Sequence, residues 1–393
     1  MDSVLQRLAI RGVVRCSEQS LESDIVDAAD YCDAQLNCLS ELSLSSCVEA
    51  DGIVDVIEGQ DGLDNIMQQF ADNHANTDVT EASAQQLAVS VESYLRAAGI
   101  NVGIRKWTPS FESADQYSAE LKDTRRTVAA GIGKWLVDAL RKVMDMIKQW
   151  WGQLTGSVTA VRTYVDKVSA KVKSLKGEAT NTDPVKLGAS ANYLTDRHGA
   201  IAKPDKQLAE SDSLFSDFLQ EWYGLFDKET HILKNLPPLK SIKIDFAVGQ
   251  ALEVKPGTGA GNLTGAKVNV VKTLKAAKSE GPLLSLTDMG HGISAAKDAL
   301  TSFTKLDQEI NRLDALSKSS AKEASAQADH YTDSEAGRAF SKRSRDLVKA
   351  FQLCSNGLTH VSPFYLKTIR ACVEYVAICT RRYATSAQDK TPS

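Results

Sequence analysis

The chain has 393 residues, of which 42% are hydrophobic and 24% are charged, a composition typical of globular proteins rather than disordered chains. It contains no run of about 18 apolar residues, which argues against a transmembrane helix. The formal net charge of −4 hides an asymmetry. Residues 1–112 hold six Lys and Arg against 19 Asp and Glu, a balance of −13, whereas residues 113–393 carry +9. This split predicts an intramolecular or assembly role for the acidic part and an anionic environment for the basic part.

The acidic part contains apolar patterns typical of amphipathic helices. Apolar residues recur at three- and four-residue spacing in two places, which predicts short helices with acidic faces. A further helix is expected between Asp78, which suits a helix start, and Gly99, which suits a C-cap. The apolar positions are Leu21, Ile25, Ala28 and Ala29 in the first helix and Leu63, Ile66, Met67 and Phe70 in the second.

The most regular pattern lies in residues 126–177, where apolar residues that include three Trp follow helical spacing and charged residues fill the opposite face. A long amphipathic helix is predicted, and three interpretations of it stay open. Its Trp face packs in a core, or it lies on a membrane surface, or its basic end contacts phosphates nonspecifically. The candidate phosphate contacts are Arg162, Lys167, Lys171, Lys173 and Lys176.

The rest of the chain predicts more helices and a small β element. Turn-forming residues predict a linker at 176–189, and a helix is expected over 206–236, before Pro237 and Pro238. Residues 241–255 and 266–274 alternate apolar and polar positions around a glycine-rich connection, which predicts paired strands. Helices are expected again over about 294–325 and from about 334 to the C-terminus, broken near Pro363. The predicted fold is mainly α, elongated and multi-helical, with a β-hairpin-like element near residues 240–275.

No local pattern favours catalysis or a cofactor. The glycine-rich stretches AGIGKW and PGTGAGNLTGAK lack the spacing of a phosphate-binding loop or a dinucleotide fingerprint. The six His are scattered singly, and no nucleophile-elbow motif occurs. We therefore predict no enzyme activity, no cofactor and no metal site.

Ser-x-Glu tripeptides are concentrated in the first 120 residues. Helix capping accounts for some of them, because Ser and acidic side chains favour helix starts. Capping does not explain why the cluster stops where the charge and the apolar pattern change. The tripeptides are Ser20-Leu21-Glu22, Ser90-Val91-Glu92, Ser110-Phe111-Glu112 and Ser118-Ala119-Glu120.

Two stretches together resemble the internal head proteins of phiKZ-like giant tailed phages. QQLAVSVESYLRAAGINVGIRKWTPSFES is similar to the end of the propeptide in that family, and KWLVDALRKVMDMIKQWWGQL is similar to the start of the mature chain. The resemblance covers roughly residues 80–155. It implies a structural virion protein of the capsid's inner body, made in the host cytoplasm, whose acidic propeptide is removed by a prohead protease that cuts after small-x-Glu.

Carried onto this sequence, the resemblance implies a principal cut after Glu112 in Ser110-Phe111-Glu112-Ser113. Earlier cuts within the propeptide are implied at Ser90/Glu92 and Ser20/Glu22. Ser118/Glu120 is a secondary site, because Ala119 lacks the bulky middle residue of the others.

The expected domains are an acidic helical propeptide over 1–112, a Trp- and Lys-rich segment over 113–180 and a helical body over 181–393. The partners implied are the protease, other capsid-interior proteins and packaged DNA, with possible ejection alongside the genome. The alternative is a helical membrane-surface or protein-interaction protein that uses the Trp-rich helix. The sequence predicts no oligomeric state.

Overall fold

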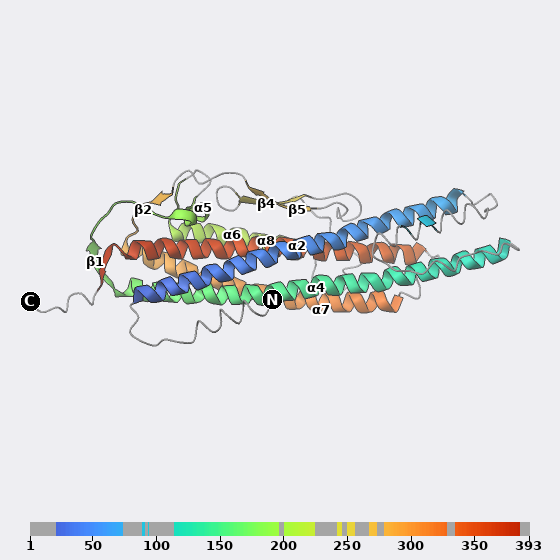
Figure 1. The fold of residues 1–393 in the computed structure, drawn as a ribbon, viewed down its shortest axis with the longest axis horizontal. Coiled ribbons are helices and arrows are strands. Elements are labelled where there is room, and N and C mark those ends of the chain that lie inside the picture. Colours follow the sequence, from blue (N-terminus) through green and yellow to red (C-terminus); the bar gives the residue numbers. More distant parts are fainter. Residues whose placement is uncertain are drawn as a thin grey trace, which may run out of the picture.

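A computed structural model describes residues 21–73, 89–90, 93, 114–195, 200–224, 242–245, 250–255, 267–272, 279–327 and 335–385. These residues form an elongated bundle whose long helices run along one axis (Figure 1). The helices are α2 (Leu21–Asn73), α4 (Ala114–Ser174), α6 (Pro204–Gly224), α7 (Leu286–Gln327) and α8 (Glu335–Thr380). A 3₁₀ turn, η2 (Gly188–Ser190), and the short helix α5 (Ala191–Leu194) connect α4 to α6.

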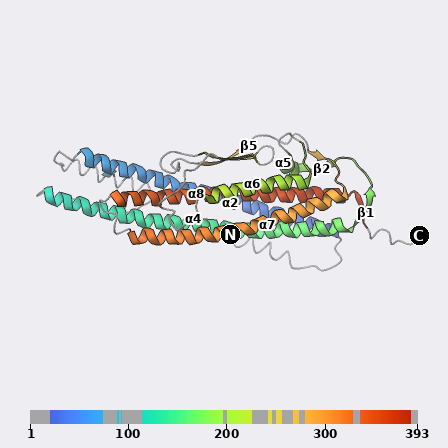
Figure 2. The same ribbon diagram turned by 180° about the vertical axis from the view of Figure 1, so that it is seen from behind.

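Helix α8 forms the centre of the bundle. From Val348 to Thr380 its described side chains are buried or half-buried on every face, as expected of a helix that neighbours surround. It packs against α2, α4, α6 and α7. Figure 1 shows α2 crossing one side of α8, and Figure 2 shows α6 lying over the opposite side. The apolar core therefore includes residues from both ends of the chain.

Helix α7 begins at a capping box, the reciprocal pairing of a helix's first side chains and backbone amides. The Asp288 backbone N–H donates to Ser285 Oγ at 3.1 Å, and the Ser285 backbone N–H donates to Asp288 Oδ2 at 3.4 Å. The Ser285 hydroxyl also donates to Asp288 Oδ2 at 2.8 Å. Lys203, just before α6, donates to Asp288 Oδ1 at 2.9 Å. These bonds set where α7 starts and tie that start to α6.

An aromatic cluster joins α6, α7 and α8. The ring of Phe215 stacks on Tyr365 with centroids 4.7 Å apart, and Phe303 stacks on Tyr365 at 5.6 Å. The Tyr365 hydroxyl donates to Asp212 Oδ1 at 2.6 Å, so its one polar group is satisfied. This cluster packs the side of α8 that faces away from α2.

The described strands form three small antiparallel sheets beside the helices. The largest has the order β3 (Ile242–Asp245), β4 (Gln250–Lys255) and β5 (Lys267–Lys272), in which Ile242 pairs with Val254 and Lys255 with Lys267. The strand β1 (Leu175–Ala179) pairs with β7 (Tyr383–Thr385), and β2 (Val185–Lys186) pairs with β6 (Glu280–Gly281). The last two sheets fasten the segment after α4 to the end of α8 and the start of α7.

The predicted fold class, mainly α and elongated with a small β element near 240–275, is confirmed. The expected short N-terminal helices are wrong in one respect, because residues 21–73 form one continuous helix. Burial along residues 25–47 stabilises α2 as a unit, and the helix continues through Gly52 despite a cost of about 1 kcal/mol.

The predicted break near Pro363 is also wrong, because α8 runs through it. Proline in a helix interior costs about 3 kcal/mol, and the burial of α8 on every face outweighs that cost. The predicted linker at 176–189 overlaps β1, β2 and η2. Its two strands pair with β7 and β6, so the segment is held against the ends of α8 and α7 by hydrogen bonds.

Candidate functional site

The acidic N-terminal helix lies against the basic end of α4. Lys171 Nζ donates to Glu22 Oε1 at 3.2 Å, and Lys167 Nζ donates to Asp24 Oδ2 at 3.2 Å. Lys167 and Lys171 are four residues apart, so they share one helix face, and that face is turned toward α2. The Lys171 side chain is only 8% exposed. Because water screens its charge poorly, the ammonium group needs the Glu22 carboxylate more than the ammonium group of a surface lysine would.

Arg370 of α8 makes a second link to the same helix. Its Nη2 donates to Asp33 Oδ2 of α2 at 2.6 Å, while its Nη1 pairs with Glu374 one turn further along α8. Ser190 of η2 completes the group, because its hydroxyl donates to Glu374 and accepts from Arg370 Nη1 at 3.2 Å. The Arg370 side chain is 14% exposed and therefore largely withdrawn from water, whereas the Asp33 side chain is 46% exposed.

The cluster changes the pKa of the groups around it. Burial acts to lower the pKa of Arg370, but the carboxylates of Glu374 and Asp33 raise it above its ordinary value. Burial raises the pKa of the neighbouring Cys32 thiol to about 12, although the Arg370 charge opposes the rise. Burial likewise raises the pKa of the Tyr164 hydroxyl. At neutral pH Cys32 and Tyr164 are therefore neutral, and the Arg370 pairs are the charged contacts here.

The Trp-rich helix is packed into the bundle at the positions that the structure describes. Trp150 is fully buried, and its indole N–H donates to Ser43 Oγ of α2 at 3.0 Å. Trp151 is half-buried, and its N–H donates to Asp307 Oδ1 of α7 at 3.0 Å. Core packing, one of the three interpretations of this helix, accounts for both residues. Trp135 has no described side chain.

Further polar contacts fix the position of α2 along α4. Gln153 Nε2 donates to Gln35 Oε1 at 3.0 Å, and Ser157 Oγ donates to the Gln35 carbonyl at 3.2 Å. Since a helix that slides by one residue presents a different face, directional bonds of this kind specify a single docked arrangement.

The predicted processing residues fall partly inside the structure. Glu22 lies in the first turn of α2, Ser90 is helical, and Ser118 and Glu120 lie inside α4. The other predicted processing residues lie outside the described residues, namely Ser20, Glu92, Ser110, Phe111, Glu112 and Ser113.

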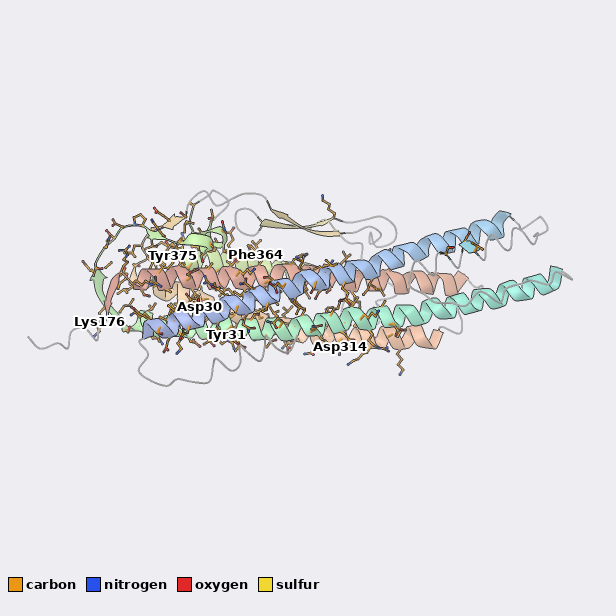
Figure 3. All side chains as sticks on the ribbon, viewed as in Figure 1. Asp30, Tyr31, Lys176, Asp314, Phe364 and Tyr375 are labelled. Carbon is orange, nitrogen blue, oxygen red and sulfur yellow. The ribbon has the colours of Figure 1, made fainter. Side chains whose placement is uncertain are left out.

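The five candidate phosphate contacts do not share one surface. Lys167 and Lys171 face α2 and are paired with its carboxylates. Arg162 and Lys173 are exposed, and Lys176 lies exposed in β1 at the end of the bundle (Figure 3). The predicted phosphate contacts therefore fall into two groups, two lysines paired with α2 and three basic residues exposed to solvent.

The sequence analysis missed Arg370, Asp33 and Ser190. Arg370 and Glu374 are four residues apart in an otherwise apolar stretch, which is a readable signal of an ion pair on one helix face. Their contact with Asp33, 337 residues away, has no sequence signature.

A thiol and an imidazole also approach each other between α2 and α8. Cys47 Sγ lies 3.0 Å from Thr359 Oγ1 and 3.6 Å from His360 Nε2. Cysteine beside histidine is the pairing of a nucleophile with a base. Cys47 is buried in the interface of the two helices, however, and helix packing accounts for the contact.

The described residues hold no group of three or more His, Cys, Asp or Glu placed to bind a metal ion. Among the same residues, no helix is both long enough and apolar enough to span a membrane.

Comparison with known proteins gives one match. A family model for phiKZ-like phage internal head proteins matches residues 32–236, a range that includes the described part of α2 from Cys32 and the whole of α4. No curated protein and no solved structure matches the chain.

Proposed function

Since this chain belongs to the phiKZ-like phage internal head proteins, we propose that residues 1–112 are a propeptide that a prohead protease removes during head assembly. The protein is a bacteriophage internal head protein, and its place is the interior of the capsid. The family is a structural one, and the helical bundle described above is the body that such a protein contributes.

The start of α4 supports a cut after Glu112. The helix begins at Ala114, so a chain that starts at Ser113 would begin where this helix begins. The Ser118-Ala119-Glu120 tripeptide lies inside α4, where its backbone amides are engaged in the helix. A protease would have to unfold the first turns of α4 to reach Glu120, which makes that site the poorer substrate.

The ion pairs between α2 and α4 support a shielding role for the acidic part. Glu22 forms an ion pair with Lys171 and Asp24 forms one with Lys167, and both lysines are among the five residues predicted to contact phosphates. If α2 left together with the rest of residues 1–112, the remaining chain would carry +9 and both lysines would be unpaired. Such a chain would bind packaged DNA nonspecifically, with an affinity that falls as salt is raised.

The alternative, a helix that binds a membrane surface through its Trp residues, has less support. The indoles of Trp150 and Trp151 contact α2 and α7 within the bundle. Binding of lipid by those two residues would require the bundle to open. The observation that carries the proposal is therefore the family match, combined with the acidic helix on the basic end of α4.

Digestion of the purified full-length chain by the prohead protease of the same phage tests the proposal. We expect the wild-type chain and a Glu120→Gln variant to yield a fragment that starts at Ser113. A Glu112→Gln variant should yield none, because the glutamate that the protease recognises is lost. Release of the Ser113 fragment from Glu112→Gln, or none from the wild-type chain, would refute the assigned cut.

A further inference from the structure

Helix α2 is an integral part of the bundle. Its inward-facing positions are buried against α4 and α8, and the buried apolar residues are Ile25, Cys32, Leu36, Leu39 and Cys47. These residues span about six turns of helix. The contact therefore has the apolar core and polar edge of a protein–protein interface, although one chain supplies both sides.

The surface of α4 and α8 that contacts α2 carries basic residues that match the negative charge of α2. Lys167 and Lys171 of α4 and Arg370 of α8 meet carboxylates of α2. Helix α2 contains 13 Asp and Glu and no Lys or Arg, so it has no opposite charges of its own to stabilise it. Its helical form consequently depends on the cationic groups and apolar surface of the body.

One predicted cut, after Glu22, lies in the first turn of α2 and detaches the carboxylate that pairs with Lys171, and the other predicted cuts lie outside α2. Cuts after Glu22, Glu92 and Glu112 leave residues 23–92 as one uncut piece, which retains every buried residue of α2 from Ile25 to Cys47. It also retains Asp33, Gln35 and Ser43, the partners of Arg370, Gln153 and Trp150. Cutting removes the covalent connection to α4 but none of these contacts.

We propose that the groove between α4 and α8 is a binding site for an acidic helix, and that residues 23–92 stay bound there as a separate chain after the cuts. This inference rests on the proposed function for the position of the cuts and departs from it in one point, because residues 23–92 are cut from the chain but are not lost from the protein. The contacts across the groove are those of a folded core, so separation would expose apolar surface of α4 and leave the Trp150 indole N–H without Ser43.

Retention has a consequence for charge. Residues 23–92 hold 15 Asp and Glu and no Lys or Arg, so together with the +9 of residues 113–393 the two-chain form would carry −6. Asp24 would continue to occupy Lys167. While Asp24 stays paired with Lys167, the charge of that lysine is partly neutralised, and the net charge of −6 makes the two-chain form a weak binder of DNA.

The test uses the full-length chain with the recognition sequence of a site-specific protease inserted between Glu112 and Ser113. After complete cutting, size-exclusion chromatography at about 150 mM salt should show both fragments in one peak at equal amounts. The helical circular dichroism of the uncut chain should be preserved. Separate elution of the N-terminal fragment, or aggregation of the C-terminal one after cutting, would overturn the proposal.

Charge reversal gives a matched pair of variants. In the cut chain, Asp33→Lys should weaken retention at least tenfold, because it places a cation against Arg370. Asp30→Lys changes an exposed residue of the same helix, and should leave retention within about twofold of the unchanged chain. Circular dichroism of the uncut variants checks that both fold. Equal effects of the two substitutions would show that the Arg370 contact does not hold the fragment.

The engineered cut separates this inference from the proposed function, because it does not use the phage protease. In purified particles, a chain that starts at Ser113 without residues 23–92 would refute retention there and leave the cut intact. Particles that hold only the uncut chain would refute the cut, and the chromatography would still decide whether the groove retains the helix.

Discussion

Arg370 of α8 donates to Asp33 of α2 at 2.6 Å, a contact that joins residues 337 positions apart in the sequence. Asp33 is 46% exposed, whereas Arg370 is largely buried, so the arginine depends more on this pair than the aspartate does. The same guanidinium holds Glu374 and Ser190, which makes Arg370 the residue that links the acidic helix, the central helix and the segment after α4.

Replacing Arg370 should therefore destabilise the protein more than replacing its partner. Arg370→Met leaves the Glu374 and Asp33 carboxylates without their cation, and we expect a loss of about 3 kcal/mol in the free energy of unfolding. Asp33→Ala should cost about 1 kcal/mol, because its carboxylate is half exposed and Glu374 remains. Urea denaturation followed by circular dichroism measures both. Equal costs for the two variants would contradict the central role given to Arg370.

The hydrogen bond from Trp150 to Ser43 should be measurable as a coupling between α4 and α2. Ser43→Ala leaves the buried indole N–H without its partner, at an expected cost of about 1.5 kcal/mol. In a Trp150→Phe background no indole N–H remains, so the same Ser43→Ala change should cost about 1 kcal/mol less. A double-mutant cycle of urea denaturation measures this difference. A coupling near zero would mean that the bond does not stabilise the docking of α2.

The start of α7 should lose stability in acid. The hydrogen bond from Lys203, assisted by Ser285, lowers the pKa of Asp288, while burial opposes the shift. A carboxyl whose folded pKa lies below its unfolded value of about 3.9 stabilises the fold above that pH, and the contribution disappears as pH falls through the folded pKa.

Thermal melts of the wild-type chain and Asp288→Asn should therefore differ most near neutral pH and converge as pH falls toward about 3. Asp298→Asn, an exposed position on the same helix, serves as the control and should show no such convergence. If the difference between the wild-type chain and Asp288→Asn were constant over this range, the Asp288 contacts would not depend on ionisation.

Gly281 of β6 should not accept a side chain. A Cβ built there lies 2.7 Å from the Tyr375 hydroxyl oxygen and 3.0 Å from Leu187 Cδ1. The Tyr375 hydroxyl donates to the Pro282 carbonyl, so moving the ring also breaks a bond. Gly281→Ala should cost about 2 kcal/mol in unfolding free energy. In a Tyr375→Phe background the cost should fall, because the nearest atom is gone, and an unchanged cost would place the strain elsewhere.

Periodicity alone predicted the long helix α4 and the inward positions of α2, because buried positions repeat at helical spacing, but it gave α2 as short helices rather than one. Trp150 and Leu154 of α4 and Ile25 of α2 occupy the inward positions that the pattern assigned to them. The β element was found from the alternation in Lys267–Lys272 and its partner β4. The unbroken course of α8 through Pro363 was not predictable, because burial from four neighbouring helices, rather than local propensity, decides it.

The sequence predicted some of the basic residues of the candidate site but not the carboxylates that pair with them. The charge asymmetry predicted an intramolecular or assembly role for the acidic segment, and Lys167 and Lys171 were among the basic residues named as candidate phosphate contacts. Which carboxylates meet them depends on the rotation and position of α2, which the sequence does not encode locally. The Asp33–Arg370 contact is of the same kind, since a single Asp among the acidic residues of α2 is selected by tertiary packing.

The mass of the protein in purified phage particles tests the account most directly. Intact-mass spectrometry, with sequencing of the N-terminus, reports where the packaged chain begins. The account predicts a chain that starts at Ser113, accompanied by an equal amount of residues 23–92. A packaged chain that still begins at Met1 would contradict it.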